Sequence, residues 1–494
     1  MCPLGETKLN IPTHLPLSKV FALLANACFL TAFLTCTYNI FVAPSGTKNN
    51  QYSMLKTASY IIYKDGSTYI ALSGETGAIA YSSTNANYVI QSAIDVLTSG
   101  SLYFKGGGET WSLRSGIAIV NKDISIFSEP TLKASASFPS GYMIRLQGVE
   151  NSRYWLNKLD GNKAENRGDF AGLEILGCKN LEILINTANF YYVDVSMPSG
   201  TLENHHIHLN INSDGNGGHA SATPIYLYNK NYDIVISGSI ENCTRQAIYI
   251  NQVPLLFLQN LIMKNCSVMG LDIRANSFVG ASNIEIDQTG TPATSIGIGV
   301  EPNATLMIDG AKIKNVQQYA VENYGTFIGN NVIIDSTQVS HNFLTRGGSD
   351  FVLLSNFEIL NVIATKYGIW VLDTSAGNHK FINGKITGVG TGLRDQGTLK
   401  SIFENIDLTG ITTKVLDATK VYHCDGYVTE NSGTASSITN ATWVSHGLAS
   451  TPTTVILTPR SQVTVWCIAR NSTHFQIGIS GGTATIDWIA EYKP

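Results

Sequence analysis

Acidic and aromatic residues recur at one position of a short repeated motif, and their types suggest sugar chemistry. The motif reads Gly-Leu-Asp-Ile at residues 270–273, and its third residue is expected to point away from the apolar side of a strand. Two carboxyl groups at this position, Asp272 and Glu322, could act as the acid and base of a glycosidase. Aromatic rings there could stack on pyranose rings. The residues that we expect to bind carbohydrate are Tyr226, Tyr249, Trp370, Arg394 and Glu174.

The reaction itself stays open at this point. Two repeat units separate Asp272 from Glu322, so in a stack of strands their backbones would lie about 10 Å apart. Side-chain orientation could then bring the carboxyl groups to the roughly 6.5 to 9.5 Å of an inverting glycosidase. A lyase would instead need a base such as Arg245, Arg274 or Arg394. A third interpretation is that an exposed strand face carries mixed polar and aromatic residues without any catalytic role.

A histidine-rich stretch offers no convincing metal site. His206 and His208 alternate onto one side of a predicted strand, a spacing that can bind a metal when a carboxylate joins them. No third ligand is evident in the sequence. We therefore predict neither a metal nor another cofactor.

A repeat of about 23 residues must position these side chains. Asn-Cys at residues 242–243 returns at 265–266, and this register extends to two columns of mostly Asn and Gly. Both residues tolerate a positive φ, so each column predicts a bend made at the same place in every unit. Units of this length fit three short strands separated by three turns. The columns are Ser237, Asn260, Asn283, Gly310, Asn331, Asn356, Asn383 and Asn405, and Asn242, Asn265, Gln288, Asn315, Ser336, Asn361, Gly388 and Gly410.

The repeat resembles the right-handed parallel β-helix proteins of the pectate-lyase-like superfamily. The resemblance rests on the Asn columns, on "Ile-x-Asn-Cys…Gly-Leu-Asp-Ile" and on "LDGNKAENRGDFAGLEILGCKNLEILIN" at residues 159–186, and it covers roughly residues 58–425. It implies an all-β, single-stranded solenoid whose open end is closed by a short helix, here Tyr88–Leu97. It also implies that a linear polysaccharide binds along one outward face. The calcium-binding aspartates of pectate lyases and the paired aspartates of polygalacturonases have no counterpart here.

The two ends of the chain differ from the repeat. Residues 20–42 carry no charge and would span about 30 Å as a helix, so they are an uncleaved membrane anchor, a cleaved signal peptide or a buried segment. The last residues show four or five short strands and resemble the small β-sandwich ends of viral tail fibres, which assist trimerisation or receptor contact. We therefore divide the chain into an amino-terminal tail and hydrophobic segment (1–49), a β-helix with its capping segment (50–430) and a small β-sandwich (431–494).

Composition limits the possible partners. Only 14% of residues are charged, the formal net charge is -4, and no basic stripe is present, so nucleic acid is not an expected partner. Both membrane interpretations of residues 20–42 predict an extracellular or cell-surface protein. The leading hypothesis is a protein that recognises a polysaccharide and can degrade it, by hydrolysis or elimination, with a homotrimer as a fitting assembly. The alternative is a membrane-anchored adhesion or structural protein without enzymatic activity.

Overall fold

The structure is a computed structural model. It describes residues 58–198, 202–219, 222–292, 294–335, 341–347, 351–372, 378–418 and 420–492. The hydrophobic segment expected at residues 20–42 lies outside these residues. Within them, no helix is both long and apolar enough to cross a membrane.

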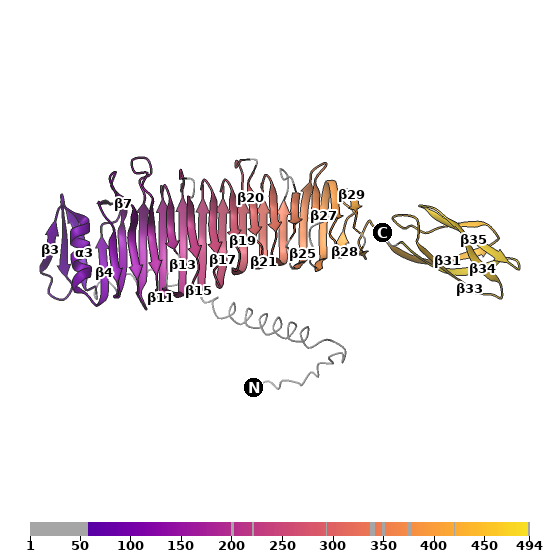
Figure 1. The fold of residues 1–494 in the computed structure, drawn as a ribbon, viewed down its shortest axis with the longest axis horizontal. Coiled ribbons are helices and arrows are strands. Elements are labelled where there is room, and N and C mark those ends of the chain that lie inside the picture. Colours follow the sequence, from indigo (N-terminus) through magenta and orange to yellow (C-terminus); the bar gives the residue numbers. More distant parts are fainter. Residues whose placement is uncertain are drawn as a thin grey trace, which may run out of the picture. The chain divides into compact units, whose positions relative to one another are not determined.

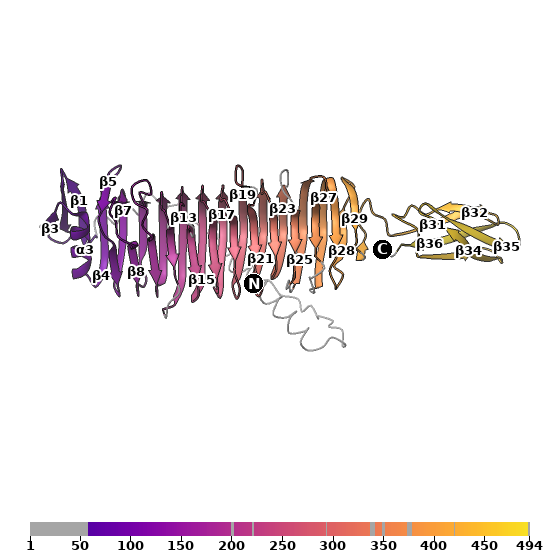
Figure 2. The same cartoon turned by 45° about the horizontal axis from the view of Figure 1, so that its top comes forward.

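Most of the described chain forms a parallel β-solenoid of the right-handed type, as predicted. Each turn holds one long and one short strand, and each strand pairs in parallel with its counterpart in the next turn (Figures 1 and 2). The long strands are β7 (Asp123–Ala134), β9 (Arg153–Asp160), β11 (Lys179–Ala188), β13 (Asn204–Asp214), β15 (Asn231–Glu241), β17 (Leu255–Lys264), β19 (Phe278–Asp287), β21 (Thr305–Lys314), β23 (Thr326–Asp335), β25 (Phe351–Val362) and β27 (Asn378–Asp395). The short strands are β8 (Gly141–Gln147), β10 (Phe170–Leu176), β12 (Val193–Met197), β14 (Thr223–Tyr228), β16 (Gln246–Asn251), β18 (Met269–Ile273), β20 (Ile296–Val300), β22 (Tyr319–Asn323), β24 (His341–Thr345) and β26 (Tyr367–Val371).

The first Asn column bends the long strands, as its positive φ values show. Asn260 lies in the middle of β17 with φ 49°, and Asn283 takes the same place in β19 with φ 53°. The bend divides each long strand into two faces, so a turn has the three strand segments that the repeat length predicted. Positive φ also confirms Gly310, Asn331, Asn356, Asn383 and Asn405 in the first column, and Asn242, Asn265, Asn315, Asn361 and Gly388 in the second.

Ser336 lies outside the described residues, and three of the described column members depart from this rule. Gly238 rather than Ser237 has the positive φ in β15, and it lies at an irregularity in the pairing with β17. Gln288 and Gly410 have no positive φ. Gln288 contributes through its side chain instead of its backbone conformation. Its Oε1 accepts a hydrogen bond from the Cys266 backbone N–H, one turn earlier, at 2.7 Å.

Replacing Asn283 with Ala should destabilise the solenoid by about 1–2 kcal/mol, because a non-glycine side chain without a local hydrogen bond is strained at positive φ. The change also removes the bond that the Asn283 Nδ2 donates to the Asn260 Oδ1 at 3.1 Å. Asn283→Gly should be milder, since Gly adopts this φ without strain. Urea unfolding of both variants measures the difference, and equal losses would contradict the role of backbone strain.

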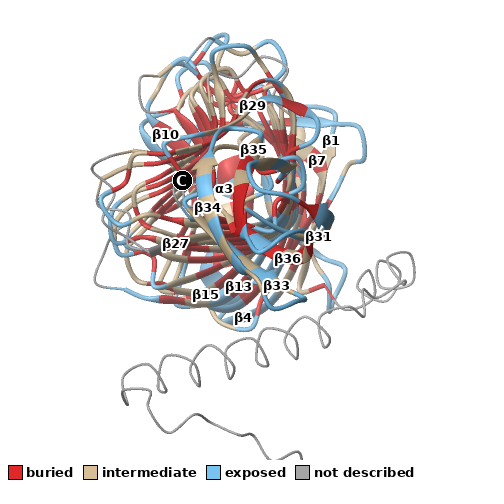
Figure 3. Cartoon of the chain, turned by 90° about the vertical axis from the view of Figure 1, so that its right-hand side faces the viewer, coloured by how far each residue is buried: buried red, intermediate tan, exposed pale blue. Residues whose placement is uncertain are grey.

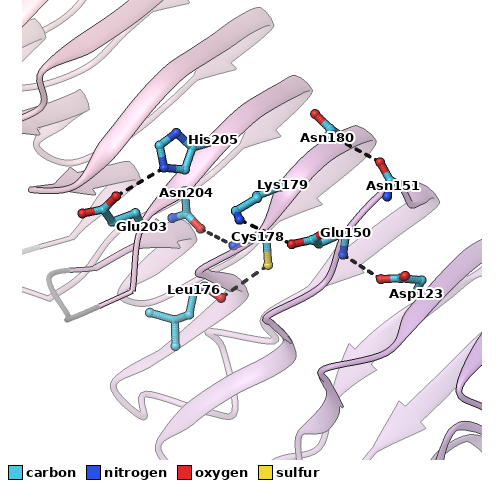
Figure 4. Close-up of polar contacts among 10 residues, drawn as sticks. All are labelled: Asp123, Glu150, Asn151, Leu176, Cys178, Lys179, Asn180, Glu203, Asn204 and His205. Atoms are coloured by element: carbon cyan, nitrogen blue, oxygen red, sulfur yellow. Dashed lines mark hydrogen bonds and ion pairs between the residues drawn. The ribbon is translucent and has the colours of Figure 1, made fainter.

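Polar side chains connect successive turns at the corners. Figure 4 shows the Asn180 Nδ2 donating to the Asn151 Oδ1 at 2.9 Å and the Cys178 backbone N–H donating to the Asn204 Oδ1 at 2.9 Å. Each bond joins residues more than twenty positions apart in the sequence, which is one turn of the coil. The first contact links two side chains, and the second satisfies a backbone N–H at the corner.

Apolar residues from all faces fill the inside of the coil, where buried positions gather in Figure 3. The pattern predicted from alternation is confirmed by Leu261, Met263, Ile284 and Ile286, each at most 2% exposed. Near the carboxy-terminal end of the solenoid, phenylalanine rings in contact form a continuous interior row. The row consists of Phe327, Phe343, Phe381 and Phe403, with neighbouring ring centroids 5.1 to 5.7 Å apart.

The amino-terminal end of the coil is closed as expected. Helix α3 (Ala86–Val96) begins after Asn85, whose side chain accepts a hydrogen bond from the Asn87 N–H. Its apolar face, with Val89, Ile90 and Ala93, joins the solenoid core. The surrounding strands are β1 (Tyr60–Asp65), β2 (Thr68–Ser73), β3 (Ile79–Ser83), β4 (Ser99–Lys105), β5 (Thr110–Leu113) and β6 (Ile117–Val120).

The carboxy-terminal residues form two small antiparallel sheets with their own core. One sheet contains β31 (Glu430–Ile438), β33 (Thr454–Pro459) and β36 (Ala484–Glu491), and the other β32 (Thr442–Ser445), β34 (Thr464–Arg470) and β35 (His474–Ser480). Phe475, Ile477 and Ile486 are fully buried in this core. The last solenoid strands are β28 (Ile402–Asp407), β29 (Ile411–Leu416) and β30 (Lys420–Tyr422).

Candidate functional site

All seven residues singled out in the sequence lie on one row across the short strands. The pairing aligns Glu174 with Ser196, Ser196 with Tyr226 and Tyr226 with Tyr249. It continues through Asp272, Gly299, Glu322, Leu344, Trp370 and Arg394. We call this register the outer row. The alternation within the repeat predicted most members of the outer row. Gly299 and Leu344 have no polar or aromatic side chain that would have marked them in the sequence.

Asp272 differs from expectation in its exposure. Its carboxylate was predicted to face solvent, but the side chain is 0% exposed. Neighbouring side chains cover it: Arg274 binds both carboxylate oxygens, at 2.8 Å through Nε and 2.9 Å through Nη2, and the Gln246 Nε2 donates at 3.0 Å. Such a doubly held carboxylate is fixed in place and has no path to water in this arrangement.

Glu322 is the carboxyl group of the outer row whose protonation is most altered. Burial raises its pKa, and the nearby Glu301 carboxylate acts in the same direction. The Arg346 guanidinium, 3.0 Å away, and the hydroxyl of Tyr324 oppose the shift without cancelling it. The side chain keeps 13% exposure, so a ligand can reach it. A reachable carboxyl group with a raised pKa is suited to donate a proton.

Glu301 is the carboxylate that the sequence interpretation missed. It follows β20, two residues beyond Gly299, which pairs directly with Glu322. Strand spacing therefore places the backbones of Glu301 and Glu322 about 8 Å apart. Glu301 accepts a hydrogen bond from the Arg274 Nη1 at 3.1 Å and is 34% exposed. The motif could not reveal it, because Glu301 stands in the turn after the strand and outside the repeated position.

A second row of rings lines the beginning of the same short strands. His341 stacks between Tyr319, at 6.1 Å and 15°, and Tyr367, at 5.1 Å and 16°. Each of these three residues opens its strand, a position that the motif ignores because it precedes the alternating segment. We call Tyr319, His341 and Tyr367 the ring row. None of these residues taken alone indicates a binding surface. The ring row becomes evident only from the strand pairing, which aligns the three residues in successive turns.

Trp370 and Arg394 connect the two rows. The Trp370 ring is tilted by 47° to Tyr367 and by 63° to His341, so it does not continue the parallel stack. Its Nε1 donates to the Gln396 Oε1 at 3.0 Å. Arg394 lies over both Tyr367 and Trp370 and donates to the Tyr367 hydroxyl at 2.6 Å. These contacts fix the indole and leave the tryptophan partly exposed.

The other predicted binding residues lie toward the amino-terminal turns. Tyr226 and Tyr249 stack face to face, with centroids 5.2 Å apart and planes 2° apart. Arg274 lies 5.8 Å from the Tyr249 centroid, so the tyrosines adjoin the Asp272 pair. Glu174 forms an ion pair with Arg145 and is 15% exposed. We call the outer row and the ring row together the band. It carries aromatic rings on both sides of Asp272 and Glu322.

Protonation of His341 should destabilise the fold. Burial first, and then Lys366, Arg394 and Arg346, lower its pKa to about 4 from the usual 6.5. Below pH 6.5 the unfolded chain therefore takes up a proton that the folded chain refuses until about pH 4, so this histidine's contribution to stability is lost as the pH falls through that window. The melting temperature of His341→Phe should consequently drop less between pH 7 and pH 4 than that of the native chain. Parallel melting curves against pH would contradict this.

Two histidines of the histidine-rich stretch pair with carboxylates. His206 pairs with Asp233 at 3.2 Å and His205 with Glu203 at 3.4 Å, each with a single carboxylate. Over the ranges that the structure describes, no group of three or more His, Cys, Asp or Glu side chains is placed to hold a metal ion.

Comparison with solved structures finds proteins with similar chain paths at low sequence identity. A tailspike protein of Escherichia coli bacteriophage HK620 in complex with a pentasaccharide is 8% identical, with a TM-score of 0.47, and the match covers 83% of this chain and 90% of that one. The Gp54 tailspike of Acinetobacter baumannii bacteriophage AP22, in complex with a capsular saccharide, is 10% identical, with a TM-score of 0.41 and coverage of 83% and 93%.

An enzyme is also among the similar structures. The endo-xylogalacturonan hydrolase of Aspergillus tubingensis is 14% identical, with a TM-score of 0.28 and coverage of 74% of this chain and 92% of that one. The sequence matches no protein-family model, and it matches no curated protein sequence. The functional argument therefore rests on the residues of the site.

Proposed function

We propose that the chain binds an extracellular polysaccharide along the outer row and hydrolyses it at Glu322. The observation that carries this proposal is the position of Glu322. Its pKa is raised, it is reachable from solvent, and it lies beside a second carboxylate in a band of partly exposed aromatic rings. This combination supports acid and base catalysis on a sugar chain better than it supports a purely structural surface.

Binding follows from the geometry of the band. Strands repeat every 4.8 Å or so along the solenoid, so residues in one row can contact successive parts of an extended chain. Trp370 offers an aromatic surface that the parallel stack does not cover, and Tyr226 and Tyr249 offer hydroxyls and ring edges on the other side of the carboxylates. Arg394 and Glu174, both held by partners, supply polar contacts at fixed positions.

In the proposed reaction, Glu322 protonates the glycosidic oxygen as the bond to the anomeric carbon breaks. Glu301 accepts a proton from water, whose oxygen forms the new bond to the same carbon. With backbones about 8 Å apart, side-chain orientation can bring the two carboxyl groups to the roughly 6.5 to 9.5 Å of inverting glycosidases. Arg274 orients Glu301 through the 3.1 Å contact.

Asp272, which we expected to act beside Glu322, has a different place in this proposal. Because its carboxylate is buried and bound by Arg274, it positions the guanidinium that in turn orients Glu301. Asp272→Asn should therefore lower activity through a misplaced Arg274. The substitution should also change the pH profile of activity, because Glu301 would then lose its fixed contact with Arg274.

Elimination has less support than hydrolysis. A lyase needs a base that is free to take a proton from carbon, but Arg274 is bound to Asp272 and Glu301. Arg394 is bound to Tyr367 and lies 3.5 Å from Asp417. Arginines engaged in this way are poor bases.

The test is incubation of the protein with a panel of acidic and neutral polysaccharides. Product size is followed together with the ultraviolet absorbance of unsaturated uronates. We expect shorter oligomers without absorbance, and an inverted anomer in the first product seen by NMR. Absorbance would mean elimination, and binding without products would remove catalysis from the proposal while keeping recognition.

A non-enzymatic surface protein is the second candidate, and the carboxy-terminal sheets favour it. They expose large apolar side chains on strands of both sheets, including Trp443, Trp466 and Ile456 at 45%, 46% and 51%. Such side chains suit a docking module, for a homotrimer or for a receptor, and a β-sandwich presented from an anchored solenoid would serve that role. Light scattering of the intact chain tests the trimer, and a monomer would count against it.

A further inference from the structure

An open hollow lies near the amino-terminal end of the band. It has a volume of about 610 Å³ and is lined from β7 and from the loops that lead into β10, β12 and β14. Its lining contains three basic residues, Lys133, Lys163 and Arg167, and one acidic residue, Asp160. A basic hollow is unusual in a chain whose formal net charge is -4. We call these three cations the basic triad.

The basic triad is not neutralised by carboxylates. Within the residues that the structure describes, none of the three has a carboxylate oxygen within the 4.0 Å of an ion pair. Lys163 instead donates a hydrogen bond to the Gly215 carbonyl, and Arg167 is exposed. On the strands the usual arrangement is the opposite, as between Lys264 and Glu241 at 3.6 Å. The triad therefore leaves positive charge available to a ligand.

The one carboxylate of the hollow is already engaged. Asp160 accepts from the Asn162 backbone N–H at 2.8 Å and from the Asn189 Nδ2 at 3.3 Å. Two acidic loop residues lie outside the lining and are also engaged: Glu165 accepts from the Asn162 Nδ2 at 2.9 Å, and Asp169 pairs with His219 at 3.7 Å. The acidic groups thus support the loop and do not cancel the triad.

An aromatic ring and a close-packed loop complete the hollow. Tyr191 belongs to the lining, and Gly218 lies against it so closely that a Cβ there would come within 2.7 Å of the ring. A larger residue at Gly218 would therefore displace the ring. These are the groups that bind an acidic sugar. An aromatic ring packs against the pyranose face, cations bind the anionic substituent, and amides form hydrogen bonds with the hydroxyls.

The hollow and the carboxylates lie at the same side of the coil. Tyr191 lies two residues before β12. Its neighbour Tyr192 lies near enough to the outer row to help raise the pKa of Tyr226. Five strand steps separate β12 from β22, which carries Glu322, or about 24 Å. One glycan of several sugar units can reach both places.

We propose that this hollow is a subsite for an anionic sugar, so that the polysaccharide bound by the chain is acidic, with carboxylate groups on some of its residues. This inference rests on the proposed function, because it names the substrate class of that band. The cations would bind the sugar carboxylate, and the remote contact would hold the chain while Glu322 acts on a bond several residues away.

The experiment compares matched pairs of glycans, each a uronate-containing chain and the same chain after its carboxyl groups are reduced to alcohols. The full-length protein should bind the acidic member of at least one pair about tenfold or more tightly, since several exposed charge contacts each contribute up to about fivefold. Arg167→Gln combined with Lys163→Gln should lower that preference severalfold. Lys158→Gln, on β9 and outside the lining, is the control that removes a charge nearby without affecting the preference.

The outcomes separate the inference from the proposal that it rests on. Equal affinity for acidic and reduced chains, or an unchanged preference in the double variant, overturns the acidic subsite but leaves polysaccharide binding in place. Binding of neither member of any pair overturns polysaccharide recognition itself, and the subsite with it.

Discussion

Glu322→Gln should reduce polysaccharide hydrolysis by about 10²- to 10⁴-fold, the range that a positioned general acid contributes. Gln matches Glu in size and can still accept the contact from Arg346 at 3.0 Å, so the fold and the binding band should persist. It cannot donate a proton to the leaving oxygen. The rate of appearance of reducing ends measures the loss, and glycan affinity measured in parallel should change little.

Glu174→Gln is the matched control for this substitution. Glu174 occupies the same outer row and is partly buried at 15% exposure, and it is also paired with an arginine, Arg145. It lies several turns away from Glu301, so its replacement removes a carboxylate from the band without touching the proposed acid. A loss of activity as large as that of Glu322→Gln would contradict the assignment of the acid to Glu322.

The pH profile provides a second readout for the same residue. Since burial and Glu301 raise the pKa of Glu322, its proton is retained to a higher pH than that of an ordinary glutamate. The alkaline limb of the activity profile should therefore lie above the usual range of a glutamic acid. Glu301→Gln should lower the pKa of Glu322, because it removes one of the two causes of the raised value. This shift is followed by NMR titration of the carboxyl group, since the variant lacks the proposed base.

The sequence was sufficient for the fold because one unit is repeated many times. The Asn columns predicted the bends, and positive φ at Asn260 and Asn283 confirms them, since few residue types tolerate that conformation. The alternation of buried residues predicted which faces point inward. The helix that closes the amino-terminal end was also predicted, with its boundaries shifted by about two residues to Ala86–Val96.

The site could be predicted only in part. Alternation located the outer row because it predicts the face of the strand on which a side chain lies. It does not predict the exposed fraction of that side chain, so the burial of Asp272 beneath Arg274 could not be predicted. Glu301 and His341 lie in a turn and at a strand start, where the period-two rule does not apply. The basic hollow is assembled from loops of unequal length, and no repeat predicts which loops come together.

Phe343→Ala should destabilise the solenoid by about 3–5 kcal/mol, as is usual when a buried aromatic ring is removed from a packed core. Phe343 is 0% exposed, and its ring lies 5.1 Å from that of Phe327 on β23 and 5.7 Å from that of Phe381 on β27. The cavity would therefore interrupt the interior row of phenylalanines. Urea unfolding measures the total loss, and Phe343→Leu, which keeps most of the apolar volume, should lose about 1.5 kcal/mol or less.

The same substitution also tests how the core supports the site. In a solenoid each turn contacts only its neighbours, so the loss should concentrate in β22, β24 and β26. Of those strands, β22 and β26 carry Glu322 and Trp370 in the outer row, and His341 begins β24. Hydrogen exchange should quicken there and not around Tyr226, while glycan affinity falls even at temperatures where the chain stays folded. Uniform acceleration along the whole solenoid would show instead that the turns unfold as one unit, and that the band does not depend on the packing directly beneath it.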